Sequence, residues 1–342
     1  MFTRIFLWIL LIQPIAMGAD IDMDVFDLVF FRTSVIVLFL ASLFDTKKRE
    51  LPGYAKNLIA GLIGLCLYNI FVHTFAQPVL ANTMNLFLGI IAFSLVYCYY
   101  DTKKSMVKYM LIAGCLNLIL LVLQRVGLDP IFDIIPQNTK YLAGAFMGNS
   151  PRLGIYFALL TPYLPILLLP LAILVSIFIG QYTMLIPVLL IVFSKIKNNW
   201  HRILGIGVCG VSALFLKSHI LRSFALRFNN AWKPGLEYFF DKPLIGHGVG
   251  ITINKSFLVM STSYIQIMLG FGILSLVWVG WLIKNIKEDI DFTPAGIGLV
   301  SLLILMAVEY PIELPRLRFS IIAIIVMFML KPKREVENVV YC

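Results

Sequence analysis

The amino-acid sequence predicts an all-α, polytopic integral membrane protein of about twelve transmembrane helices, with one long loop on the outer face. Of its 342 residues, 60% are hydrophobic and only 13% are charged, whereas soluble domains are roughly 45–50% apolar and roughly 25% charged. Apolar runs recur along the chain near the length of about 20 residues that a helix needs to cross the hydrocarbon core. These observations exclude an ordinary soluble domain and indicate one helical membrane domain over residues 1–342.

The net charge of +10 would suggest a nucleic-acid partner in a soluble protein. Here the basic residues gather in short clusters between apolar runs, and the preference for Lys and Arg in cytoplasmic loops explains most of the charge. We therefore expect no nucleic-acid partner, and we expect both termini in the cytoplasm. The five cysteines have no spacing typical of a metal site or a disulfide framework, and neither a metal nor a cofactor is predicted.

Five apolar helices are expected in the first part of the chain. Residues 1–19 have features of a signal peptide, because Arg4 precedes an apolar run and a Met-Gly-Ala stretch. Pro14 interrupts that run, however, and many hydrophobic segments follow, so we favour a short uncleaved helix. The next four helices are expected at 25–44, 57–76, 84–100 and 106–127.

A loop over 128–151 separates these helices from the rest, since it has too few apolar residues to span a membrane. Three short spans are expected at 152–169, 171–179 and 182–194, where four prolines leave the boundaries open. The remaining helices are expected at 203–216, 264–283, 295–308 and 319–330. This order places three loops on the outer face: 128–151, 310–318, and the main loop 217–263 between the ninth and tenth helices.

The outer loops carry more basic residues than the positive-inside rule allows. In 217–263 these are Lys217, Arg222, Arg227, Lys233, Lys242 and Lys255, and the last outer loop adds Arg316 and Arg318. An anionic headgroup and a solvated charged loop explain this excess equally well on charge alone. Arginine offers a planar fork of donors for phosphate oxygens. Arg222 and Arg227 are five positions apart, about 140° around an ideal helix, so one straight helix cannot present both on one face.

Three further features indicate function or have a simpler reading. Arg32 lies inside an apolar run, where charge is costly and often functional, although its side chain can also snorkel to the surface. Pro234-Gly235 is expected to stop any helix. The glycine-rich segment 243–250 predicts a turn where backbone approaches a ligand closely, and within it His247 is a candidate proton acceptor or an ordinary surface histidine. Trp232 suits either sugar stacking or the bilayer interface.

Three segments together resemble the O-antigen polymerase and ligase superfamily. They are Arg227-Phe-Asn-Asn-Ala-Trp232, Phe240-Asp-Lys-Pro-Leu-Ile-Gly-His-Gly-Val-Gly250, and the helix that opens at Ser263-Tyr264 and contains Gly270-Phe-Gly272. Residues 144–152 also resemble the loop that precedes the central helices of that family. The resemblance implies a metal-independent glycosyltransferase of GT-C-like architecture in the bacterial inner (plasma) membrane. Its substrate would be an undecaprenyl-diphosphate-linked glycan, and no nucleotide sugar would be needed.

The resemblance implies a role in holding the diphosphate for Arg227, Arg222 and Arg152, and the residues themselves supply the other candidates. The catalytic candidates are Arg227, Arg222 and His247, the arginines holding the diphosphate as it leaves. Asp241 and Glu237 are alternatives to His247 as the base. The candidates for binding the diphosphate or glycan are Arg152, Lys233, Trp232, Gly246, Gly248, Gly250, Arg316, Arg318 and Arg32.

One departure from the family pattern separates its branches. Ligases of this family carry a His-Asn pair where this chain has Ser261-Thr262. The expected function is therefore polymerisation of lipid-linked repeat units of O-antigen, capsule or exopolysaccharide (Wzy type), with membrane lipid, a chain-length regulator and a flippase as partners. A glycan ligase is the nearest alternative. A transporter or flippase is another, but it predicts inverted repeats and broken helices with polar residues, and the charges here gather at one face.

Overall fold

The computed structural model describes residues 1–15, 23–46, 48–73, 77–101, 105–126, 128, 145–147, 150–195, 199–215, 217–249, 263–286, 290, 292–308 and 317–330. Over these residues the regular structure is entirely helical. By length and composition, three helices of this part can cross a membrane, at Gly53–Val72, Val79–Tyr99 and Met106–Arg125, and the other apolar helices are shorter. The prediction of a helical membrane protein is confirmed at this level.

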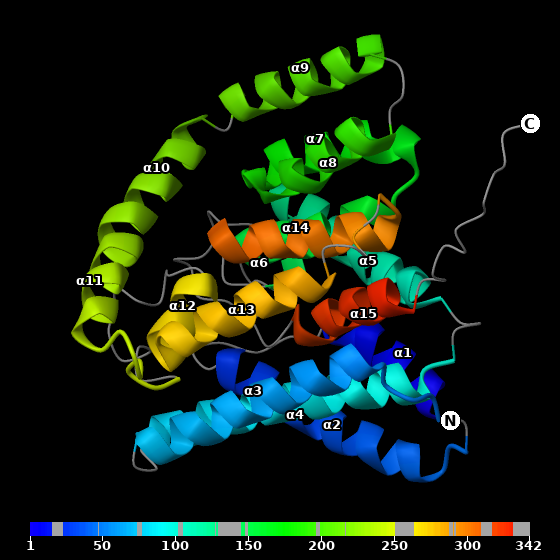
Figure 1. Ribbon diagram of the computed structural model, residues 1–342. Coiled ribbons are helices and arrows are strands. Elements are labelled where there is room, and N and C mark those ends of the chain that lie inside the picture. Colours follow the sequence, from blue (N-terminus) through cyan, green and yellow to red (C-terminus); the bar gives the residue numbers. More distant parts are fainter. Residues whose placement is uncertain are drawn as a thin grey trace, which may run out of the picture.

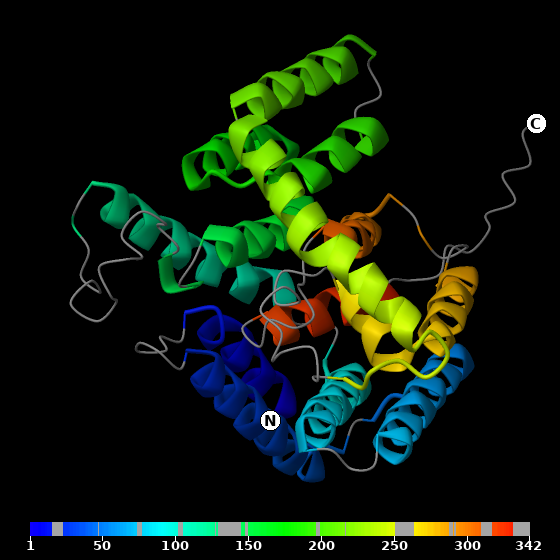
Figure 2. The same cartoon turned by 90° about the vertical axis from the view of Figure 1, so that its left-hand side faces the viewer.

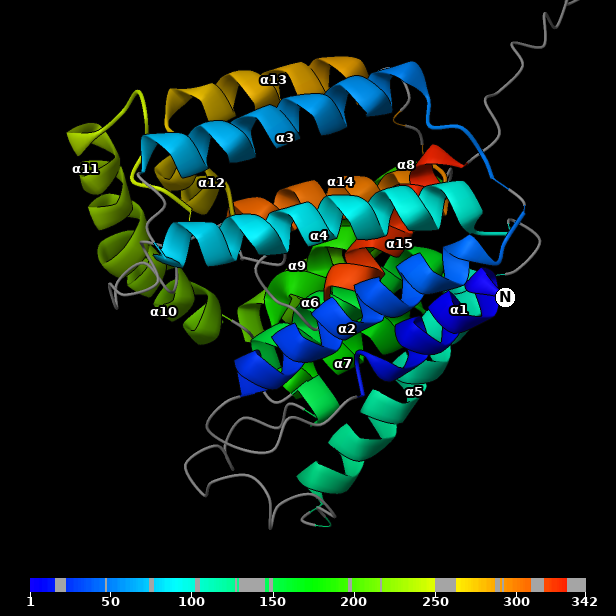
Figure 3. The same ribbon diagram turned by 90° about the horizontal axis from the view of Figure 1, so that it is seen from below.

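The first five helices lie close to their predicted positions. They are α1 (Phe2–Ile12), α2 (Met23–Leu43), α3 (Gly53–Val72), α4 (Gln77–Tyr99) and α5 (Met106–Arg125). Phe2, Phe6 and Leu10 of α1 are fully buried, and α1 packs against α2 and α5 (Figure 3). This first helix is therefore an integral part of the core, as the interpretation of residues 1–19 as an uncleaved helix expects.

Prolines and glycines divide the later helices more finely than the hydrophobic pattern predicts. The expected span 152–169 separates into α6 (Ser150–Leu160) and two short 3₁₀ turns, η3 (Thr161–Tyr163) and η4 (Ile166–Leu168), because Pro162 and Pro165 remove helical donors. The expected span 264–283 separates into α12 (Ser263–Phe271) and α13 (Ile273–Ile286) at Gly272, whose φ is +65°. The other late helices are α7 (Leu169–Ile179), α8 (Leu185–Lys195), α9 (Asn199–Phe215), α14 (Pro294–Val308) and α15 (Arg318–Met329).

The main loop is helical where the sequence predicted irregular structure. Its first part forms α10 (Lys217–Arg227), a π-helical turn η6 (Phe228–Trp232) and α11 (Lys233–Asp241). The expectation that Pro234-Gly235 stops a helix is wrong, because the chain continues as α11 with Pro234 in its first turn, directly after the π-helical turn η6. Figures 1 and 2 show α10–α11 at a steep angle to α3, α4, α13 and α14, passing the ends of α14 and α12 and stopping above the ends of α3 and α4.

The core is built around α15. Phe319 at its start is fully buried, and its ring packs against Phe6 of α1 at 6.2 Å and Phe31 of α2 at 5.2 Å. Its backbone N–H donates to Oε1 of Gln13 at the end of α1, at 3.1 Å. Both Figures 1 and 3 show that α15 begins well inside the ends of α4. The start of α15 therefore lies in the interior of the bundle.

Candidate functional site

The glycine-rich segment of the main loop packs onto the break between α12 and α13. The backbone N–H of His247 donates to the carbonyl of Leu269 at 2.7 Å, and that of Gly248 donates to the carbonyl of Gly270 at 3.2 Å. In the opposite direction, the N–H of Ile273 donates to the carbonyl of Pro243 at 2.8 Å. Two segments of backbone therefore bond to each other directly.

Glycine is required on both sides of this contact. Gly246 has φ +69°, and a Cβ there would lie 2.6 Å from the backbone nitrogen of Gly272. A Cβ on Gly272 would lie 2.5 Å from the carbonyl oxygen of Leu244. The sequence predicted a close approach of backbone to a ligand at Gly246 and Gly248. In the structure Gly246 meets protein backbone, and Gly248, with φ +93°, meets the side chains of Val79 and His73.

Asn69 of α3 joins both segments, and the sequence analysis missed it. Its side chain is fully buried. The amide Nδ2 donates to the carbonyl of Gly270 at 2.6 Å, and Oδ1 accepts from the backbone N–H of Val249 at 3.1 Å. A polar residue in an apolar helix was the available signal, since a buried amide needs partners for both of its ends.

His247 is buried, with only 6% of its surface exposed, so its interpretation as a surface residue is wrong. Its ring stacks on that of Tyr238 at 3.6 Å, and Nε2 lies 2.6 Å from the Tyr238 carbonyl oxygen. A carbonyl oxygen only accepts hydrogen bonds, so Nε2 carries the proton in this contact. If His247 acts as a base, the proton must therefore go to Nδ1.

A second histidine, His73, lies against the same glycine segment at the end of α3. Burial lowers the pKa of His73, and the positive charges of Lys242 and His247 lower it further, while a hydrogen bond to the Ile245 backbone opposes the shift. The net shift is downward, so the neutral ring is the stable form at neutral pH.

Two of the candidate arginines meet at one stretch of α2: Arg32 belongs to it, and Arg318 packs against it. Nε of Arg32 donates to Oδ1 of Asn85 on α4 at 3.0 Å. The Arg318 guanidinium lies over the ring of Phe31, the neighbour of Arg32, at 4.8 Å from the centroid. Both side chains are partly buried. Arg32 is therefore bonded to a neighbouring helix, and Arg318, expected on an outer turn, is the first residue of α15.

Arg152 occupies the first turn of another helix. It is partly buried in α6, and α6 packs against α15. Neither α6 nor α15 has an acidic residue in its first turn. Helix N-termini carry partial positive charge and ordinarily favour acidic side chains. Two helices that pack together therefore each carry an arginine in the first turn.

The remaining candidates are distributed along the main loop or lie outside the described residues. Arg222 and Arg227 both lie in α10, five positions apart in one α-helix, and their side chains are outside the described part. Trp232 ends the π-turn and meets Phe224 edge-on at 5.5 Å. Lys233, Glu237 and Asp241 are exposed on α11. Gly250, Arg316 and the departure at Ser261-Thr262 lie outside the described residues.

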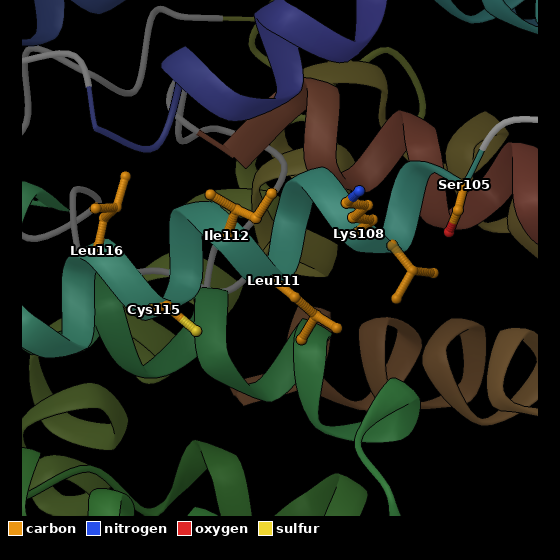
Figure 4. A pocket seen from close by; sticks show the side chains of 7 residues that line it. Ser105, Lys108, Leu111, Ile112, Cys115 and Leu116 are labelled. Carbon is orange, nitrogen blue, oxygen red and sulfur yellow. The ribbon is translucent and has the colours of Figure 1, made fainter.

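A groove of about 500 Å³ runs along α5, far from these groups in the sequence (Figure 4). Its lining residues are Ser105, Val107, Lys108, Leu111, Ile112, Cys115 and Leu116. All of them come from one helix and most are apolar. A ligand site needs polar groups that converge from several elements, so this groove is not a candidate for the reaction.

Comparison with known proteins gives no match to any protein-family model, to any curated protein or to any solved structure.

Proposed function

We propose that this chain is a membrane glycosyltransferase that polymerises undecaprenyl-diphosphate-linked oligosaccharide repeat units at the outer face of the bacterial inner membrane. One observation carries the proposal. Arg152 and Arg318 each occupy the first turn of a helix, and these two helices pack together. Arg32 lies on the same stretch of α2 that Arg318 contacts.

An anion accounts for this arrangement better than a structural role does. A cation at a helix N-terminus is unfavourable with respect to the helix dipole, and charge within a membrane bundle is costly. A diphosphate would reverse both effects, because its oxygens accept from backbone N–H groups at the helix start and from the guanidinium forks. The lipid carrier would bring that diphosphate to the bundle without leaving the membrane.

The proposed reaction joins two lipid-linked units. A hydroxyl of one unit attacks the anomeric carbon of the growing chain, the bond from that carbon to the diphosphate oxygen breaks, and undecaprenyl diphosphate leaves. Arginines that stabilise the departing negative charge lower the barrier by electrostatics. The hydroxyl proton passes to a base, for which Asp241, Glu237 and Nδ1 of His247 are the candidates. About twelve spans, a GT-C-like arrangement and cytoplasmic termini belong to the same proposal.

The first test is the gel profile of surface glycan and lipid-linked intermediates in a strain that lacks this gene. Single repeat units on the surface, with the long ladder gone, are the expected result. Long chains that remain on the lipid carrier would instead identify a ligase. An unchanged ladder in a strain without a redundant enzyme would contradict both transferase functions and favour transport.

Complementation with arginine variants tests the site itself. Arg152→Ala, Arg318→Ala and Arg227→Ala are expected to abolish the ladder, and Lys substitutions to restore it only in part, because Lys lacks the bidentate fork. Arg49→Ala is a matched control. Arg49 also lies over an aromatic ring, Tyr97, at 5.7 Å, but it follows α2 at the other end of the bundle. Variants that insert normally and keep a full ladder would refute the arginine site.

A further inference from the structure

The long helix formed by α10, η6 and α11 carries an exposed apolar row along its length. The row consists of Leu221, Phe224, Phe228, Leu236 and Phe240, which are exposed by 57%, 55%, 47%, 42% and 71%. Trp232 continues it between Phe228 and Leu236 and meets the Phe224 ring. Steps of three or four residues keep side chains on one side of a helix, so these residues form a continuous apolar stripe.

A polar row runs beside the apolar one. Asn229, Lys233, Glu237 and Asp241 are all exposed, and each follows a residue of the apolar row or Trp232 by one position. A third side of the helix faces the protein, because Gly235 and Phe239 are buried. Phe239 packs in a cluster with Leu269 of α12. The helix therefore has one side on the protein, one apolar side and one polar side.

The π-turn keeps the apolar row straight. Four-residue steps overrun an α-helical turn of 3.6 residues by about 40° each, so a row of such steps would wind around a regular helix. Between Phe228 and Trp232 the backbone is π-helical, and its wider turn takes up more residues. This offsets part of the drift in the middle of the row. A π-turn at this position is what a straight stripe requires.

The position and charge of this helix identify what covers the stripe. It follows the apolar helix α9 almost directly and runs at a steep angle to the candidate spans α3 and α4 (Figures 1 and 2). Residues 217–242 contain five Lys or Arg and two Asp or Glu, a net charge of +3. A positively charged amphipathic helix in this orientation fits the surface of a bilayer with anionic lipids.

We propose that α10–η6–α11 is a membrane-surface helix whose apolar stripe lies in the headgroup region of the surrounding phospholipids. The polar row then faces water, and the buried side holds α11 on α12. The inference does not depend on the transferase function, and it makes the lipid surface a binding partner of the main loop.

Spin labelling of the full chain in vesicles of phosphatidylcholine and phosphatidylglycerol tests the proposal. The native cysteines are first replaced, and single cysteines are then placed at Phe228 and Phe240 of the apolar row. Asn229→Cys and Glu237→Cys are the matched controls, because each is exposed on the same helix within three residues of a test position. Collision rates of the nitroxide with oxygen, which concentrates in lipid, and with a water-soluble nickel chelate are then compared.

We expect the apolar row and the polar row to give opposite ratios of oxygen to nickel collision rates. Oxygen collisions should dominate at Phe228→Cys and Phe240→Cys, and nickel collisions at the two control positions. Nickel dominance at all four positions would overturn the proposal, because the stripe would lie in water. Exclusion of both reagents from the stripe, with dipolar broadening between labels, would also overturn it and would identify a second copy of the chain as the cover.

Discussion

Asn69 is a single side chain on which three segments of the chain converge. It bonds the main loop through Val249 and the α12–α13 break through Gly270. We predict that Asn69→Leu lowers the free energy of unfolding by about 1–3 kcal/mol, because the N–H of Val249 loses its acceptor, whereas the Gly270 carbonyl still accepts from Gly248. Thermal unfolding in detergent measures the loss.

Two variants make this test specific. Asn69→Asp keeps an acceptor for Val249 but places a buried carboxylate oxygen against the Gly270 carbonyl oxygen, so its loss should be at least as large. Asn57→Leu, at an exposed position of the same helix, should leave the unfolding midpoint nearly unchanged. Equal midpoints for Asn69→Leu and Asn57→Leu would contradict the role assigned to Asn69.

Gly246 occupies a backbone conformation that other residues reach at a cost. Gly246→Ala combines a positive φ, worth roughly 1–3 kcal/mol for a residue with a Cβ, with a Cβ placed 2.6 Å from backbone. We expect a clear fall in the thermal midpoint. Gly64→Ala is the control, because a Cβ on Gly64 meets nothing within 4 Å and alanine favours a helix interior by up to about 1 kcal/mol. A midpoint unchanged by Gly246→Ala would show that the segment is not packed as described.

His73 makes the stability of this contact dependent on pH. Its pKa is lowered from 6.5 in the folded chain, so the unfolded chain binds the proton first as the pH falls. The contribution of neutral His73 is complete above 6.5 and is lost as the pH falls below 6.5 toward the folded-state pKa. We expect the thermal midpoint to fall with acidification over that range, and His73→Gln to reduce the fall. His201→Gln, at an exposed position of α9, should not reduce it.

At the scale of elements, α11 is anchored through one side of its helix. Phe239 is 7% exposed and packs with Leu269, whereas its neighbour Phe240 is 71% exposed. We predict that Phe239→Ala releases α11 from α12, since loss of a buried Phe costs about 3–5 kcal/mol. Limited proteolysis within residues 217–249 should become several-fold faster. Glu237→Ala, on the exposed polar row of the same helix, should leave the rate unchanged; equal acceleration by both variants would contradict this anchoring.

Elements were predictable where their cause is local. The apolar run and flanking charges of 106–127 predicted α5 to within two residues at either end. The division at Gly272 was not predictable in this way, because its cause is the backbone of Leu244, far away in the sequence. The helix α10–α11 was missed for another reason. It contains too many polar residues to match the pattern of a membrane-spanning helix. Its apolar row is spaced by three or four residues in the sequence, but the helix stop expected at Pro234-Gly235 divided the row.

The candidate site was predictable in residue type more than in geometry. Arg32 was singled out because charge in an apolar run is costly. Its hydrogen-bond partner Asn85 lies on another helix, and the sequence does not show which residues of two helices face each other. Arg318 was assigned to an outer turn, since arginines at a span boundary usually snorkel. Its place inside the bundle follows from Gln13 and Phe31, which pack against the start of α15 and lie about 300 residues earlier in the chain.

At the scale of the whole molecule, different segments of the chain lie at the two ends of the bundle. Figure 1 shows the start of α1 and the end of α15 at the end opposite to α10–α11. The segment after α2 lies at the same end as the start of α1, where the N-terminal ammonium meets Asp45 at 3.5 Å. Figures 1 and 3 show α3 and α4 running between the two ends, and both are long and apolar enough to cross a membrane. The two ends should therefore face opposite sides of the membrane.

Labelling with a membrane-impermeant thiol reagent tests this orientation in intact cells. In a background without native cysteines, Asp241→Cys on α11 should react from outside, because Asp241 is exposed on the polar row. Lys48→Cys, exposed at the other end, should react only after the membrane is permeabilised. The positive-inside rule gives the expected direction, since it favours the basic segment around Lys48 on the cytoplasmic side; the main loop is expected outside despite its basic residues, as the proposed function requires. Reaction of both positions from the same side would contradict a bundle that spans the membrane, and reaction of Lys48→Cys alone would reverse the orientation and remove the lipid-linked donor from reach of the arginines.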